Sequence, residues 1–461
     1  MEMLSPRIEF KSDESVLGYV ARLAGFHAGI RSGEFLSDLG INLYELARSE
    51  PEGMNKLAAY TGVPIKALEA NAPRGLGHRG YQLRGEFVTA EFLASPQTVF
   101  CPACLADDDR SSGGVPQARR HLWHWQLRAV RTCHVHGLPL VSRKAKNTRD
   151  RFHELAVVVP EVSADLEQLV PKRDPRQVSP LQQYVLKRLD GLPGSVWLDR
   201  QGLEQGVRAS EMVGVLVAYG ATPNLDKFTD DDWDHAGAVG YSYTSQGEAG
   251  IRQALSEAQK SFKYNGSNPG PQAVFGRLYQ WLRYSKSNKS VGDIKWIVRD
   301  HILDTMPVRK GATVLGKELS ERRLHTCASL ARETKLDPRT LRGMLIAKGL
   351  LPEDASEAGY YLFDSARGLE VANSMGRLVA VTGIPKALGC SRPLANQLIS
   401  ERILTPIVSE LTHAKGHTKK GFDSLEVERL LHCMEVRSKS VSDLPAGMVD
   451  LATAAMKSNA P

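Results

Sequence analysis

Apolar residues recur at intervals of three and four positions along most of this sequence, which is the spacing that buries one face of an α-helix. The pattern is clear in residues 16–25, 35–47, 179–193 and 274–285, where polar residues occupy many of the intervening positions. Residues 263–271 interrupt it with glycine, proline and asparagine and are expected to form a loop. The chain is therefore predicted to be mainly α-helical.

Residues 57–70 are predicted to form a helix-turn-helix. A short helix leads to a turn at Gly62, and Pro64 opens a second helix with Lys66 on its exposed first turn. A helical hairpin that makes no contact with nucleic acid accounts for the same pattern equally well.

A second helix-turn-helix is predicted in residues 323–351. The first helix ends in a turn at residues 334–336, and Asp337 caps the second helix. Leu341 and Leu345 are expected to face the core, which leaves the N-terminal end of this helix polar. That end enters the major groove in DNA-binding proteins of this kind, where arginine can read guanine. Its exposed side chains are expected to be Arg339, Thr340 and Arg342.

A third module, in residues 379–431, is predicted to be a winged helix-turn-helix. Residues 384–388 and 391–400 form the helix pair, and residues 403–407 with the lysine- and glycine-rich segment after them form two strands around a wing. The outward polar set of the second helix is Arg392, Asn396 and Gln397. The lysines expected at the tip of the wing, where they suit contact with phosphate, are Lys415, Lys419 and Lys420.

A capping box of Asp423 and Glu426 is expected to open the helix that follows the wing. Together these two C-terminal modules suit contact with DNA. Packing of the modules on each other, or on a partner protein, would use the same surfaces and remains the alternative interpretation.

The length of 461 residues is typical of two to four compact units. We expect a multi-domain chain in which a small zinc-ribbon module and the winged unit accompany the helical parts. The expected division is 1–95 (N-terminal helical and helix-turn-helix domain), 96–145 (zinc-finger module), 146–180 (linker), 181–310 (helical body), 311–360 (helix-turn-helix), 361–440 (winged unit) and 441–461 (flexible tail).

Composition narrows the class of protein. Hydrophobic residues make up 42% and charged residues 24% of the chain, as in an ordinary globular protein. No apolar run approaches the roughly 18 residues that span a bilayer, and the first residues lack an apolar signal region. Six cysteines are too few for a secreted disulfide framework. We therefore expect a cytoplasmic, nucleoid-associated protein with no membrane partner.

The positive charge is concentrated in one part of the chain. Residues 110–200 contain 16 Lys/Arg against 8 Asp/Glu, an excess of +8, so the rest of the +7 chain sums to −1. Such an excess suits a surface that faces phosphate, although a solvated face explains the charge equally well.

Two tight pairs of metal-binding residues stand out in this basic region. Cys101 and Cys104 form one pair and Cys133 and His136 the other, and each pair can supply two ligands from one turn. Together they predict one structural zinc site, whereas isolated buried cysteines are the alternative. A catalytic zinc would need an open position, and four protein ligands leave none. Nearby histidines that could replace His136 as the fourth ligand are His121, His124 and His134.

The segment between the two pairs is rich in aromatic residues. Trp123 and Leu127 recur at helical spacing, with Leu122, Trp125 and Val130 on a neighbouring stripe. We expect these residues to form the apolar floor beneath the metal site; a surface that stacks on bases is the alternative. The arginines expected to project outward from this floor are Arg119, Arg120, Arg128 and Arg131.

These motifs resemble the zinc-finger core of the TniQ family, the relatives of the transposition target selector TnsD. The shared features are C-P-A-C-L-x-x-D at residues 101–108 and the W-x4-V-x2-C-x2-H-G-x2-L pattern that ends at Leu140. The opening E-S-V-L-G-Y-V-A-R-L-A of residues 14–24 resembles the start of the same family, and residues 57–73 resemble its helix-turn-helix. The resemblance covers residues 10–141 and is weak from 142 to 461. The sequence shows no second set of zinc ligands, because Cys327, Cys390 and Cys433 are interpreted as core cysteines.

The resemblance implies a non-enzymatic protein that selects the target DNA for transposition and recruits an AAA+ regulator and a transposase. Double-stranded DNA would be bound through the helix-turn-helix units. A CRISPR effector complex, as the docking site of an RNA-guided adaptor, and a second copy of the chain are the other candidate partners.

Two further classes remain open. A zinc-containing transcriptional regulator would use the same helix-turn-helix units on an operator. An enzyme is not favoured, since the sequence has no metal-binding set of spaced carboxylates, no P-loop and no recombinase signature, although dispersed acidic sites can escape such a search.

Overall fold

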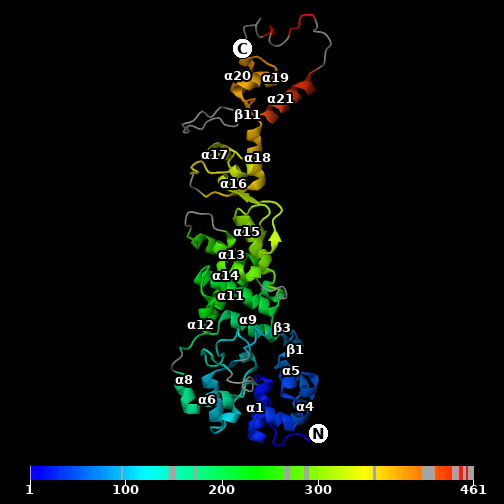
Figure 1. Cartoon of the computed structure of the whole chain (residues 1–461), viewed down its shortest axis with the longest axis vertical. Helices are drawn as coiled ribbons and strands as arrows, with labels where there is room; N and C mark the ends of the chain where they lie inside the picture. The colour runs from blue at the N-terminus through cyan, green and yellow to red at the C-terminus, as the bar shows by residue number, and fades with distance from the viewer. Residues whose placement is uncertain are drawn as a thin grey trace. The chain divides into compact units, whose positions relative to one another are not determined.

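The computed structural model is mainly α-helical, as the periodicity predicts. It divides into two compact units, Met1–Arg299 and Asp300–Pro461, each of which is described by itself (Figure 1). The structure describes residues 2–94, 97–144, 152–170, 174–263, 270–284, 290–356, 360–406, 421–438, 446–449 and 453–454. Within these residues no helix is long and apolar enough to cross a membrane.

The first unit opens with a bundle of short helices whose core includes Tyr19, Leu23 and Leu57. Gly62, with φ +71°, ends the fourth helix in the left-handed region that glycine adopts without strain, and Pro64 precedes the fifth, so the helix-turn-helix predicted at residues 57–70 is present. The helices are α1 (Val16–His27), α2 (Ser32–Asp38), α3 (Leu43–Ala47), α4 (Pro51–Thr61) and α5 (Ile65–Ala70).

A small antiparallel sheet in the order β1-β2-β3 and a separate ribbon of β4 and β5 follow. The ribbon pairs Phe100 with Val141, which places the residues just after β4 beside those just before β5. The elements of this part are β1 (Arg74–Gly77), β2 (Gly80–Leu83), β3 (Glu86–Thr89), β4 (Gln97–Phe100), α6 (Pro102–Ser111), the 3-10 turns η1 (Pro116–Ala118) and η2 (Trp123–Gln126), and β5 (Val141–Lys144).

The aromatic segment between the ligand pairs is not the regular helix that its spacing suggested. Only the 3-10 turn η2 forms there, flanked by extended residues, because Leu122 and Leu127 have β-region backbones. Trp125 and Leu127 are nevertheless buried in one core with Cys101 and Cys133, so the apolar floor is confirmed.

The expected linker at 146–180 differs from the structure over its described residues. Helices α7 (Leu155–Val158) and α8 (Ser163–Leu169) form there, and α8 packs on α6. Leu155 and Leu166 belong to the same core as the metal-binding region. Residues 152–170 are therefore part of the N-terminal unit. The charge- and proline-rich composition of this segment is typical of a linker and did not predict its packing.

A helical body completes the first unit. Helices α11 and α12 approach so closely that a Cβ on Gly214 or Gly240 would overlap the backbone of the other helix, which explains glycine at both positions (Figure 1). The body contains α9 (Pro180–Leu189), α10 (Val196–Arg200), α11 (Leu203–Tyr219), the 3-10 turn η4 (Leu225–Lys227), α12 (Asp230–Thr244), α13 (Glu248–Ser261), α14 (Pro271–Tyr284) and α15 (Ile294–Thr305), and α15 crosses the boundary between the units.

The second unit contains two helix-turn-helix modules after a short hairpin of β6 (Thr313–Val314) and β7 (Lys317–Glu318). Module 1 is defined as residues 323–376 and module 2 as the described residues 377–406 and 421–437. Module 1 contains β8 (Leu324–His325), α16 (Cys327–Thr334), α17 (Pro338–Ala347), β9 (Phe363–Asp364) and α18 (Ser365–Gly376). Module 2 contains β10 (Leu378–Ala380), the 3-10 turn η5 (Val381–Gly383), α19 (Ile384–Leu388), α20 (Arg392–Ser400), β11 (Gly421–Asp423) and α21 (Ser424–Arg437).

The two modules repeat one structure. In each, a strand precedes the helix pair and pairs antiparallel with a strand after it, so β8–β9 corresponds to β10–β11. Each module has its own apolar core. Buried residues at equivalent positions of the two cores are Leu330 and Ile384, Leu341 and Ala395, Leu351 and Leu404, and Phe363 and Phe422.

The prediction of two strands around a C-terminal wing is corrected in part. Residues 403–406 form no strand, and β11 pairs instead with β10, which precedes the helix pair. The N-cap at Asp423 is confirmed, but Glu426 accepts from the backbone and hydroxyl of Thr405 rather than closing a capping box. The wing lysines Lys415, Lys419 and Lys420 lie outside the described residues.

The separate cores predict separate unfolding. Phe422→Ala should cost module 2 about 3–5 kcal/mol, because a buried ring is replaced by a cavity. Phe363→Ala, the matched change, should cost module 1 a similar amount. Amide hydrogen exchange should show faster exchange in the altered module alone; acceleration of both modules by either variant would contradict the prediction.

Candidate metal centre and helix-turn-helix surfaces

The structure brings Cys101, Cys104, Cys133 and His136 together, and their ligand atoms all lie within 4.8 Å of one another. The Nδ1 atom of His136 lies 3.3 Å from Sγ of Cys104 and 3.7 Å from Sγ of Cys133. The Sγ atoms of Cys104 and Cys133 are 3.6 Å apart. This cluster could hold a metal ion, and it is the set that the spacing of the two pairs predicted.

The β4–β5 ribbon and α6 create this meeting point. Cys101 is the N-cap residue of α6, which puts Cys104 on the first turn of the helix. The second pair lies in a tight turn in which the Gly137 backbone N–H donates to the Cys133 carbonyl at 2.9 Å. Gly137 has φ +65°, the left-handed conformation that the sharp exit requires.

The thiols of Cys101, Cys104 and Cys133 do not all favour the ionised form when no cation lies between them. Hydrogen bonds from Cys101 and Cys104 hold the pKa of the Cys133 thiol far below its ordinary value. Hydrogen bonding to Cys101 and Cys133 and burial raise the pKa of Cys104 well above its ordinary range. A cation is what would stabilise three thiolates in so small a buried space, and binding one releases protons.

A carboxylate fixes the orientation of the imidazole. Oδ2 of Asp107 lies 2.9 Å from Nε2 of His136, which leaves Nδ1 to face the three sulfur atoms. A carboxylate behind a metal-binding histidine sets its tautomer and ring position. The spacing of the ligand pairs does not identify Asp107 as this partner; its place on α6 brings it there.

The alternative fourth ligands serve other roles. Nδ1 of His121 lies 2.9 Å from the hydroxyl of Ser15, and its ring stacks on His153 with centroids 4.4 Å apart. His124 packs edge-on against His134 at 5.0 Å. Burial lowers the pKa of His153 to about 4 and that of His121 well below its ordinary value, so the stacked His121–His153 pair is neutral near neutral pH.

Two arginines that were expected to project outward are buried. Nε and Nη2 of Arg119 donate to the carboxylate of Asp109, at 2.7 and 2.6 Å. Nη1 donates to the Val159 carbonyl, and Nη2 also donates to the Glu161 carbonyl. Arg131 is likewise buried. Arg120 is half-buried and binds Asp108, and only Arg128 is exposed.

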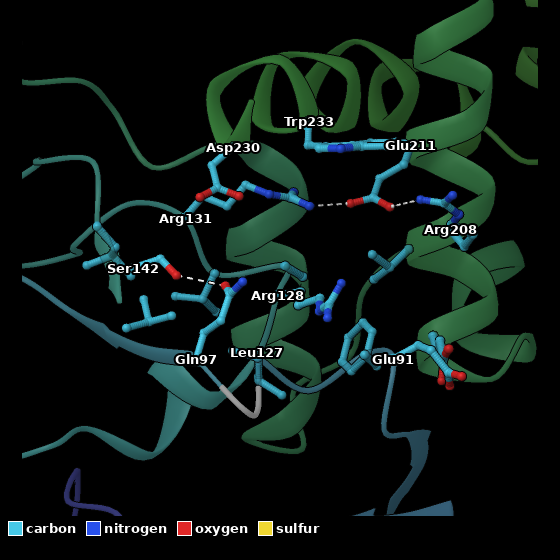
Figure 2. A pocket seen from close by; sticks show the side chains of 18 of the residues that line it. Glu91, Gln97, Leu127, Arg128, Arg131, Ser142, Arg208, Glu211, Asp230 and Trp233 are labelled. Atoms are coloured by element: carbon cyan, nitrogen blue, oxygen red, sulfur yellow. Dashed lines mark hydrogen bonds and ion pairs between the residues drawn. The ribbon is translucent and has the colours of Figure 1, made fainter. Parts of the chain in front are cut away.

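Arg131 lines a cavity of about 570 Å³ in the first unit, shown in Figure 2. Its guanidinium donates to Glu211 of α11 at 2.6 Å, and Arg208 binds the other carboxylate oxygen at 3.1 Å. Although burial opposes ionisation, the two arginines hold the pKa of Glu211 below its ordinary value. The ion-pair group of Arg131, Glu211 and Arg208 therefore connects the metal-binding segment to helix α11 of the helical body.

The comparisons with known proteins agree with this geometry. Residues 5–140 match the family model described as TniQ. The chain therefore contains a TniQ domain. The TniQ domain thus covers the N-terminal helices, the β1–β3 sheet and the whole metal cluster, and it marks the chain as associated with transposition. No curated protein matches the chain.

The opening motif of the TniQ domain has a structural explanation. The Ser15 side chain caps α1 by accepting from the Gly18 backbone N–H at 3.1 Å. The buried carboxylate of Glu14 lies 2.8 Å from Nε of Arg22, eight residues later on α1. Burial raises the pKa of Glu14 to about 7 in spite of this arginine.

Of the side chains predicted to contact DNA, those among the described residues lie on the second helix of each module. Asp337 accepts from the Thr340 backbone N–H at 2.9 Å, and Ser391 accepts from the Leu394 backbone N–H at 3.4 Å, so both predicted caps are present. Arg342 is half-buried. The exposed members of the set are Arg339, Thr340, Arg392, Asn396 and Gln397. Their contact with DNA stays a prediction.

The remaining cysteines were interpreted as core residues. Cys327 and Cys390 are half-buried and pack against the cores of module 1 and module 2, whereas Cys433 is exposed, so the interpretation is wrong for Cys433. None of the three belongs to a metal-binding group among the residues that the structure describes.

The buried ion pair predicts a large loss of stability on mutation. Arg119→Ala should lower the free energy of unfolding by about 3–5 kcal/mol, because Asp109 would be left charged and unpaired in the interior. Arg200→Ala, at an exposed arginine, is the matched control and should change stability little. Urea unfolding checks both; an Arg119→Ala variant as stable as the control would show that the pair contributes nothing.

Proposed function

We propose that the metal is a structural zinc ion. Zinc holds sulfur at about 2.3 Å and nitrogen at about 2.0–2.1 Å, so ligands at the corners of a tetrahedron are about 3.4–3.8 Å apart. The measured separations among Cys104, Cys133 and His136 are 3.3, 3.6 and 3.7 Å, close to that range. Three thiolates and one imidazole are ligands that zinc favours. When bound, the ion would neutralise the thiolates and hold the two turns together.

Removing one ligand tests this assignment. Cys104→Ser should abolish zinc binding, measured by elemental analysis, and should loosen the fold around α6. Cys433→Ser, at an exposed cysteine, should retain one zinc ion per chain. Zinc-free wild-type protein that is well folded would contradict a structural role for the metal.

We further propose that the chain is a non-enzymatic adaptor that selects the DNA target for transposition. The TniQ domain supports the link to transposition, and the tandem modules supply surfaces suited to duplex DNA. Residues 323–348 contain six Lys/Arg against two Asp/Glu, and residues 377–406 contain four against one. This local excess of cations around both helix pairs is the observation that carries the proposal, because phosphate contacts dominate affinity for DNA.

The adaptor would act through partners rather than by chemistry of its own. The metal cluster has four protein ligands, which leaves no open position for a substrate. Recruitment of an AAA+ regulator and a transposase is the activity that the family implies, and their binding surface is part of the proposal. Magnesium-dependent strand cleavage by the pure chain would overturn the non-enzymatic assignment.

Direct binding to DNA is proposed over docking on a CRISPR effector complex. Two modules with complete helix pairs favour direct contact. An RNA-guided adaptor would retard duplex DNA only together with the effector. A transcriptional regulator would bind its own operator and would need no AAA+ partner.

A charge-removing variant gives a quantitative test. Arg392 lies exposed at the first position of α20, so Arg392→Ala should weaken binding to every duplex and reduce the slope of log affinity against log salt by about one. Lys227→Ala removes an exposed charge from the first unit and should leave the slope unchanged. Fluorescence anisotropy across a salt series measures both. Failure of the wild-type chain to bind any duplex would contradict direct DNA binding.

A further inference from the structure

The repeat between the two modules extends to individual backbone hydrogen bonds. The Ser365 N–H donates to the Arg323 carbonyl at 2.9 Å, and at the equivalent place the Ser424 N–H donates to the Arg377 carbonyl at 3.0 Å. The first helix of each pair ends in a left-handed residue, Lys335 with φ +58° and Gly389 with φ +62°. The second helices therefore occupy the same position in their own modules.

The turn after the second helix also matches. In module 1 the Leu350 and Leu351 N–H groups both donate to the Leu345 carbonyl, at 2.8 and 3.3 Å. In module 2 the Ile403 and Leu404 N–H groups donate to the Leu398 carbonyl, at 2.9 and 3.1 Å. Because α17 has ten residues and α20 has nine, this turn aligns Leu345 with Leu398, one position away from the alignment that the caps give. The equivalence of residues in the first half of the two helices is therefore set by the caps alone.

Equivalent positions near the start of these helices carry different chemistry. Counting from the caps Asp337 and Ser391, Arg342 is equivalent to Asn396. Arg339 also lies at the start of α17, and Gln397 follows Asn396 on α20; Arg339, Asn396 and Gln397 are exposed. Arginine makes paired hydrogen bonds to guanine in the major groove, whereas asparagine and glutamine make them to adenine. The two copies thus present different base preferences on one framework.

The connection between the modules leaves almost no slack. Helix α18 ends at Gly376 and β10 begins at Leu378, so Arg377 alone separates them. One residue of chain spans at most about 3.5 Å. A step of one turn along DNA is about 34 Å, which such a connection cannot absorb.

We propose that modules 1 and 2 read two different segments of one duplex at a single fixed spacing, with module 1 selecting guanine and module 2 selecting adenine. The inference rests on the proposed binding of DNA and names the sequence class that binding selects. Linking two weak readers raises the affinity for a duplex that carries both segments above that for either segment alone.

The test uses the full chain and a library of duplexes with a randomised interior. Sequencing of the retained duplexes should reveal two blocks, one centred on guanine and one on adenine, at a constant separation. Asn396→Ala should erase the preference in the adenine block alone. Arg342→Lys keeps the charge and most of the packing but loses the two-pronged contact, so it should erase the preference in the guanine block alone. Lys227→Ala should preserve both blocks.

Spacing is tested on a selected duplex. Inserting about five or about ten base pairs between the blocks turns or shifts one block by half a turn or a full turn. Either insertion should reduce the affinity to that of a duplex with one block. Changing one block to another sequence should weaken binding by about 5- to 150-fold.

Each negative result of these experiments contradicts a different part of the proposal. A single block, or variants of both modules that affect the same bases, would overturn separate reading. Equal affinity after either insertion would overturn the fixed spacing. Retention of duplexes without any sequence preference would overturn the inference and leave DNA binding by the adaptor intact. Retention of no duplex at all would remove the proposed direct binding itself.

Discussion

Four ligand atoms from two turns more than 25 residues apart share one small buried space, and the N-terminal unit is organised around that meeting. The thiols hydrogen-bond to one another and cannot all ionise unaided, so the space favours a cation. The β4–β5 ribbon aligns the turns, α6 supplies the first pair, and Asp107 orients the imidazole. Each of these features is local, but their sum fixes the course of the chain from residue 97 to residue 144.

Buried ion pairs extend this order beyond the metal cluster. Arg119 links α6, through Asp109, to the segment that carries α7 and α8, and Arg131 links the second ligand turn to Glu211 of α11. A buried charge that loses its partner costs several kcal/mol, so these pairs specify which surfaces meet. Some of the arginines in this basic region thus form ion pairs in the interior, and others lie on the surface.

The second unit follows a different principle, the repetition of one small module. Each copy buries its own core, and each holds its second helix by the same turn and the same strand pair. Repetition preserves the framework while side chains at equivalent positions diverge: counted from the caps, the half-buried Arg342 corresponds to the exposed Asn396. Under the proposed binding of DNA, this divergence would give the chain two different recognition surfaces on one repeated framework.

The helical class, the two pairs of metal-binding residues and the caps at Asp337 and Ser391 can all be recognised in the sequence, because each depends on spacing within a few residues. The repeat was not recognised there: Phe363-Asp364-Ser365 recurs as Phe422-Asp423-Ser424, but the longer segment before the second copy hides the match. The burial of Arg119 and Arg131 and the pairing of β10 with β11 depend on the folded structure. Those outcomes depend on partners that are distant along the chain, and neither composition nor local periodicity records which distant groups will meet.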